Sequence, residues 1–333
     1  MFFLNLTDFV LFVNLNTVEQ LAEIINNSKE FKVLKHNKQA GLISHAYLFS
    51  SPDSIYLNEF VNMFAKMVLG GDALIENGTH PDFIKITSDK TIGVKDIEDI
   101  ASYVYIMPYE ADYKLYYIAD ASLLTEEAQN KLLKTIEEPP QSAIIVLGAS
   151  SCGAILPTII SRTNKIELSP INQGDLINLL IKDGASEREA SIYASVSQNN
   201  LTKAQELNKN KEYLNLYKNV LEMLENLNSS KDILGFVSKI NLQKVSLNDF
   251  FSLTISVLRD IMIVKSNKNE LVCFKQDLDS LERISWGFTL ESVSLALKEA
   301  FSATKDLAFN ANPVCVLDEF LLKMVEVKVK CKK

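Results

Sequence analysis

The chain has 333 residues, more than one typical hydrophobic core holds, so we expect two or three domains. Its 47% hydrophobic and 23% charged residues are typical of a globular protein, and the net charge of −8 excludes nucleic-acid binding through an overall basic surface. The four cysteines form no C-x-x-C pair, which disfavours a zinc site or a disulfide framework and favours a reducing compartment.

The first 36 residues form an N-terminal extension whose role the sequence does not indicate. Its opening, MFFLNLTDFVLFVNL, is apolar, but it has no basic start, contains Asp8 and lacks a small-residue cleavage site, so we do not expect a secretion signal. No other run reaches the roughly 18 apolar residues that a membrane helix needs. We therefore expect a cytoplasmic protein without membrane contact.

Residues 37–170 alternate short apolar runs with helical patterns, which predicts an α/β domain with a mostly parallel sheet flanked by helices. The expected strands are Ala46–Phe49, Phe83–Ile86, Leu115–Ile118, Ile144–Leu147 and Lys165–Leu168. The expected helices are Leu57–Leu69, Val94–Tyr105, Glu126–Glu138 and a short one near Pro157–Ser161. Strand signals then stop, which predicts a small helical domain over 171–210 and a larger helical domain over 211–333.

The turn after the first expected strand, SSPDSIYLN (residues 50–58), lies where a nucleotide-binding protein carries its phosphate loop, G-x-x-x-x-G-K-[ST]. Aligned with that pattern, Ser51 and Tyr56 replace the glycines, Leu57 replaces the lysine and Asn58 replaces the hydroxyl residue. Glycines let backbone N–H groups face the phosphates and the lysine neutralises their charge, so we expect no nucleotide hydrolysis here. Two interpretations stay open at this point: an ordinary strand-to-helix turn, or a nucleotide site that has been lost.

Three segments point to a family: HAYLFSSPD (45–53), DASLLTEEAQNKLLKTIEEPP (120–140) and LPTIISRT (156–163). Together they resemble the delta-prime subunits of bacterial DNA polymerase III clamp loaders, which are AAA+ proteins, and GTHPDFIKI (78–86) matches the same family. The resemblance implies an AAA+ α/β module, then a helical lid and a helical collar that serves oligomerisation. It also implies a place in a ring with gamma or tau ATPases and a delta subunit, which loads a sliding clamp on primed DNA.

The resemblance assigns roles to individual residues. Delta-prime subunits generally do not hydrolyse ATP and lend an arginine to a neighbour's ATP site; Arg162 matches that finger, supported by Ser161, although Thr163 replaces the family's cysteine. Ala119 stands at the metal-binding aspartate of the Walker B strand and Asp120 at its catalytic glutamate, so this motif is degenerate too.

These positions imply no ATPase activity of the chain's own, no cofactor, and membership in a complex with DNA-directed DNA polymerase activity. Many delta-prime proteins carry a four-cysteine zinc module, but residues 67–72 contain no cysteine, so we expect no metal. Contacts with the sliding clamp and DNA are expected through the complex. Two alternatives remain: an active AAA+ ATPase of the gamma/tau type, and a diverged AAA+ scaffold outside replication.

Overall fold

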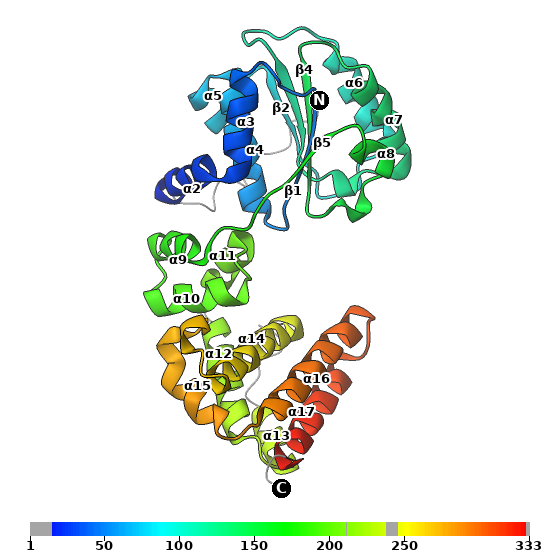
Figure 1. The fold of residues 1–333 in the computed structure, drawn as a ribbon. Helices are drawn as coiled ribbons and strands as arrows, with labels where there is room; N and C mark the ends of the chain where they lie inside the picture. Colours follow the sequence, from blue (N-terminus) through cyan, green and yellow to red (C-terminus); the bar gives the residue numbers. More distant parts are fainter. Residues whose placement is uncertain (1–14, 211, 238–245, 331–333) are drawn as a thin grey trace. The chain divides into compact units, whose positions relative to one another are not determined.

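The computed structural model describes residues 15–210, 212–237 and 246–330, so the apolar opening of the chain lies outside the described residues (Figure 1). The chain divides into two compact units, which we describe separately. The first holds residues up to Asp175 together with Asn200–Thr202, and the second holds Leu176–Asn199 and the residues from Lys203 onward. The finer division into extension, α/β domain, lid and collar stays a prediction.

The first unit contains a five-stranded parallel sheet in the order β2-β3-β4-β1-β5. The strands are β1 (Ala46–Ser50), β2 (Phe83–Ile86), β3 (Lys114–Ile118), β4 (Ala143–Ala149) and β5 (Asn164–Glu167). Every residue of β1, β3 and β4 is buried, because these three central strands have neighbours on both sides and helices on both faces. All five expected strands are present, each within two residues of its expected bounds, which confirms the predicted α/β fold class.

Helices cover both faces of this sheet, α3, α4 and α5 on one side and α6, α7 and α8 on the other (Figure 1). The helices of the unit are α2 (Leu15–Asn27), α3 (Lys29–Gln39), α4 (Ser54–Leu69), α5 (Asp72–Glu76), α6 (Val94–Val104), α7 (Glu126–Glu137) and α8 (Pro157–Ile160). Residue 37, where the sequence places the start of the α/β domain, lies inside α3. The Phe31 ring of α3 packs edge-on against Phe60 of α4 at 5.5 Å between ring centroids, so α3 contributes to the core of the unit.

The expected helix Leu57–Leu69 begins earlier than predicted, at Ser54. The cause is an N-terminal cap: the side chain of Asp53 accepts a hydrogen bond from the backbone N–H of Tyr56 at 3.1 Å. The predicted start at Leu57 rested on the apolar face of the helix, which begins after the cap. As a result, residues 54–58, which lie at the position of a phosphate loop, form the first turn of α4.

The second unit is helical, as predicted from the loss of strand signals. Its helices are α9 (Gln173–Lys182), α10 (Glu187–Val196), α11 (Leu201–Lys209), α12 (Glu212–Asn226), α13 (Ser230–Val237), α14 (Leu247–Lys265), α15 (Leu278–Ser285), α16 (Leu290–Ala308) and α17 (Pro313–Lys330), of which α9 and α11 begin with residues of the first unit. The central helix is α14, which packs against α12, α15 and α16. Its fully buried Phe250 and Phe251 close the core of this unit. No described helix is both long and apolar enough to cross a bilayer.

Candidate nucleotide-handling site

The four residues that replace the phosphate-loop residues are engaged in contacts within the protein. Tyr56 and Leu57 are each 3% exposed, so an aromatic ring and an aliphatic chain fill the interior where the glycine and lysine would be needed. Burial raises the pKa of Tyr56 to about 12, with a further contribution from the charge of Glu30. Asn58 donates its amide N–H to the carbonyl oxygen of Ser54 at 2.8 Å and accepts from the hydroxyl of Tyr117 at 3.1 Å.

The backbone of the same turn is also satisfied by protein groups. Ser51 donates its N–H to the carbonyl oxygen of Ala149 at 3.0 Å, and its hydroxyl oxygen accepts from the N–H of Asp53 at 3.1 Å. The N–H of Ile55, in the first turn of α4, donates to the hydroxyl oxygen of Thr202 at 3.0 Å. A phosphate loop needs such N–H groups to be available to the ligand, and these donors already have acceptors.

The carboxylate of Asp53 is the centre of this network, and the sequence analysis did not single it out. It is 5% exposed and accepts from the N–H of Tyr56, from the N–H of Leu201, and from both the N–H and the hydroxyl of Thr202, the hydroxyl at 2.7 Å. Thr202 and Leu201 belong to the same compact unit as the sheet. Asp53 thus places a negative charge at the N-terminal end of α4, where a phosphate would bind in an active relative. An aspartate directly before a helix is a typical cap, which was the available signal.

The strand end predicted as a degenerate Walker B motif carries a capping interaction. Ala119, after β3, has no group that could bind a metal, and the carboxylate of Asp120 accepts from the N–H of Ser122 at 3.0 Å and from its hydroxyl at 2.5 Å. This contact caps a short 3₁₀ turn, Ala121–Leu123. In the described part of the chain, no three His, Cys, Asp or Glu side chains are grouped to hold a metal ion.

Arg162 lies on the surface just after α8, beside Ser161. Its Nε is 2.5 Å from the Oε1 of Glu137 at the end of α7, and one terminal nitrogen donates to the carbonyl oxygen of Thr158 at 3.2 Å. The same nitrogen is 3.4 Å from the hydroxyl of Ser161, which itself donates to Thr158. The contacts of Arg162 and Ser161 are therefore with each other and with residues of α7 and α8, rather than with residues 51–58 or 119–120.

Helix α8, which precedes this arginine, is anchored to the domain because Ile159 is completely buried in the core cluster between the sheet and α7. Glu137 belongs to the EEPP sequence block, but its contact with the arginine was not predicted. The side chains of Arg162 and Glu137 are 43% and 45% exposed, so the ion pair is screened by solvent and contributes at most about 1 kcal/mol. The ion pair with Glu137 thus orients the guanidinium, and little free energy is needed to break it.

Comparisons with known proteins agree with the resemblance seen in the residues. The family described as "DNA polymerase III, delta subunit" matches residues 26–172. The delta-prime subunit of DNA polymerase III from Bacillus subtilis is 25% identical, over 89% of this chain and 95% of that protein. The gamma subunit from Buchnera aphidicola (of Schizaphis graminum) is 26% identical, over 93% and 96%. A solved gamma-subunit-related protein from Thermotoga maritima is 20% identical over 94% of this chain and 99% of that one, with a TM-score of 0.45.

Proposed function

We propose that this chain, which is similar to clamp-loader subunits of DNA polymerase III, is a non-hydrolysing, delta-prime-like subunit that supplies Arg162 to the ATP site of a neighbouring gamma/tau-type ATPase. Its partners would be that ATPase and a delta subunit, and, through the complex, a sliding clamp and primed DNA. The observation that carries the proposal is the presentation of Arg162: an exposed guanidinium on a buried platform, oriented by Glu137.

The chemistry of phosphoryl transfer explains why such an arginine is useful. Charge spreads over the oxygens of the transferred phosphoryl group, and a guanidinium can form two parallel hydrogen bonds to them. The exposed ion pair with Glu137 costs little to break, whereas a finger arginine accelerates hydrolysis by roughly 10³–10⁵. The exchange of a carboxylate partner for a phosphoryl partner is therefore strongly favourable in the transition state.

The residues at the phosphate-loop and Walker B positions support the proposal that this chain does not hydrolyse ATP. Asp53 repels phosphate from the N-terminal end of α4, the buried Leu57 provides no positive charge, and Asp120 is engaged in a cap. The similarity to gamma subunits keeps an active ATPase as the second candidate. Nucleotide binding separates the two: we expect the isolated chain to bind no fluorescent ATP analogue in the presence of Mg²⁺, and saturable binding would favour the second candidate.

The main experiment measures ATP hydrolysis, stimulated by clamp and primed DNA, in the reconstituted complex. Complexes with the wild-type chain, with Arg162→Ala and with the chain omitted are compared. Arg283→Ala is the matched control, because this arginine is also exposed and lies 3.9 Å from a glutamate, Glu225.

We expect Arg162→Ala to assemble normally and to slow its one partner site by roughly 10³–10⁵, with the other sites leaving a residual rate. Arg283→Ala should hydrolyse ATP like wild type. Wild-type hydrolysis and clamp loading by an assembled Arg162→Ala complex would refute the finger.

A further inference from the structure

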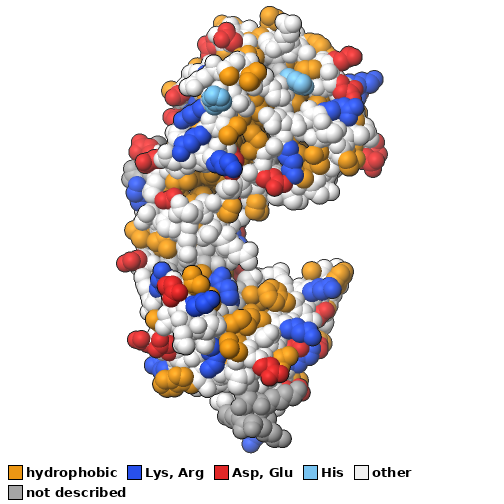
Figure 2. Space-filling view, in the orientation of Figure 1, with side chains coloured by type: hydrophobic (Ala, Val, Ile, Leu, Met, Phe, Trp, Pro, Cys, Tyr) orange, Lys and Arg blue, Asp and Glu red, His pale blue; other side chains and the backbone are white. Residues whose placement is uncertain are grey.

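Helix α3 carries a local excess of positive charge in an acidic protein. Between Lys29 and Gln39 the chain has four lysines and one glutamate, a balance of +3, whereas the whole chain carries −8. The buried side of the helix holds Phe31 and Leu34. Figure 2 shows Lys and Arg side chains gathered over α3 on the face turned toward the viewer.

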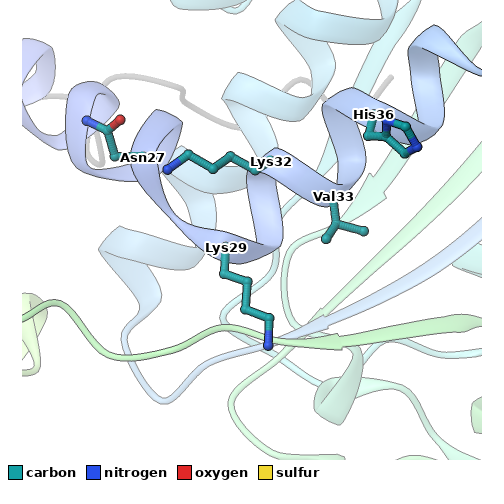
Figure 3. A pocket seen from close by; sticks show the side chains of 5 residues that line it. All are labelled: Asn27, Lys29, Lys32, Val33 and His36. Carbon is teal, nitrogen blue, oxygen red and sulfur yellow. The ribbon is translucent and has the colours of Figure 1, made fainter.

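One stripe of this helix lines a shallow, open hollow. Its lining residues are Asn27, Lys29, Lys32, Val33 and His36. Figure 3 shows the side chains of Lys29, Val33 and His36 along the helix and that of Lys32 directed back toward Asn27 at the end of α2. We call Lys29, Lys32 and His36 the α3 basic stripe.

The two lysines of the α3 basic stripe have no hydrogen-bond or ion-pair partner among the described residues, whereas Lys35 and Glu30 of the same helix are each hydrogen-bonded. Lys35 donates to the side-chain oxygen of Asn26 at 2.9 Å, and Glu30 accepts from the hydroxyl of Ser169 at 2.7 Å. Lys29 and Lys32 form no ion pair with a described residue. Both also lie near the positive N-terminal end of α3, where a cation is unfavourable for the helix. A ligand with negative charge would remove that penalty.

The features of the hollow restrict the class of ligand. It is open and has no buried donor, so it is not built for a small anion. Val33 is its single apolar lining residue, which is too little for a membrane-inserting face, and it lacks the aromatic side chains typical of a protein interface core. From Lys29 to His36 the stripe covers seven steps along the helix, about 10 Å at 1.5 Å per residue, and duplex DNA carries one charge per roughly 1.7 Å of its axis.

We propose that the α3 basic stripe contacts the phosphate backbone of duplex DNA without reading its sequence. The choice of DNA as the polyanion rests on the proposed function. The contact consists of lysine ammonium groups exchanged for counterions along the backbone, so it depends strongly on salt. It adds a site for DNA on the outer side of a helix whose inner side packs against α4.

The test measures the binding of the purified full chain to fluorescent duplex DNA by anisotropy between about 50 and 200 mM salt. Wild type is compared with Lys29→Gln/Lys32→Gln and with a control of equal charge change, Lys182→Gln/Lys231→Gln, on exposed lysines of the second unit. Because each backbone contact contributes about 0.9 to the slope of log affinity against log salt, the double variant should lower the slope by about 1.8. The control should leave it unchanged.

Acetylation of lysines followed by mass spectrometry gives a second readout, in which bound DNA should protect Lys29 and Lys32 but not Lys182. No DNA binding by wild type at about 50 mM salt, or equal changes in the two double variants, would overturn the inference. Binding to vesicles that contain phosphatidylserine in place of DNA would overturn it as well. The proposed arginine finger is independent of these outcomes, since it is measured by hydrolysis in the complex.

Discussion

Substitution of Asp53 by asparagine tests whether its carboxylate holds the first turn of α4. In the best orientation, the amide oxygen keeps the contacts of Oδ1 with Tyr56 and Thr202, and the amide NH₂ replaces Oδ2, which accepts from the N–H of Leu201. Two donors then face each other, and the N–H of Leu201 is left without an acceptor. A hydrogen bond to a charged group contributes about 1.5–3 kcal/mol, so local opening should become easier by that amount.

Amide hydrogen exchange measures this opening directly. A loss of about 1.5–3 kcal/mol corresponds to roughly 10- to 150-fold faster exchange, which we expect in peptides that cover residues 51–57 and 199–203. Asp96→Asn is the control, because it makes the same chemical change at an exposed carboxylate that accepts one N–H, from Gly93 at 2.9 Å. Unchanged exchange in both peptides of Asp53→Asn, or the same acceleration there in Asp96→Asn, would refute the reasoning.

Gly148→Ala should destabilise the protein by about 1–3 kcal/mol or more, measured by chemical denaturation, because a Cβ there would lie 2.6 Å from the carbonyl oxygen of Ala119; wild-type stability would contradict this. Glu137→Gln should lower stability by less than about 1 kcal/mol and leave hydrolysis by the reconstituted complex within a few-fold of wild type, since only an exposed ion pair is lost; a thousandfold loss would give this glutamate a direct role. Burial alone would raise the pKa of Asp82, but three backbone N–H groups of residues 109–111 hold it below its usual value. The stabilisation by this carboxylate is therefore complete above the unfolded value of about 3.9 and is lost as the pH falls through the folded pKa. Asp82→Asn should thus destabilise the protein more at pH 7 than at pH 3 in denaturant titrations, and an equal loss at both would contradict the sign.

The sheet could be predicted from the sequence because buried parallel strands appear as short apolar runs, as in Ala143–Ala149. Arg162 was assigned its role because it lies in a block whose spacing resembles a known family, and that role stays a prediction. The contact between Asp53 and Thr202 could not be predicted, since it joins residues 149 positions apart and no periodicity of the chain encodes such a pair. The same is true of the contact between Arg162 and Glu137, which depends on how α7 and α8 pack.

The burial of Tyr56 and Leu57 has an evolutionary consequence. Tyr56→Gly would empty a site filled by an aromatic ring, at a cost of about 3–5 kcal/mol, and Leu57→Lys would place an ammonium group at a position that is 3% exposed. Neither step gains a phosphate contact while Asp53 remains. Nucleotide binding at this turn would therefore require several substitutions together, of which at least the two at Tyr56 and Leu57 are destabilising alone.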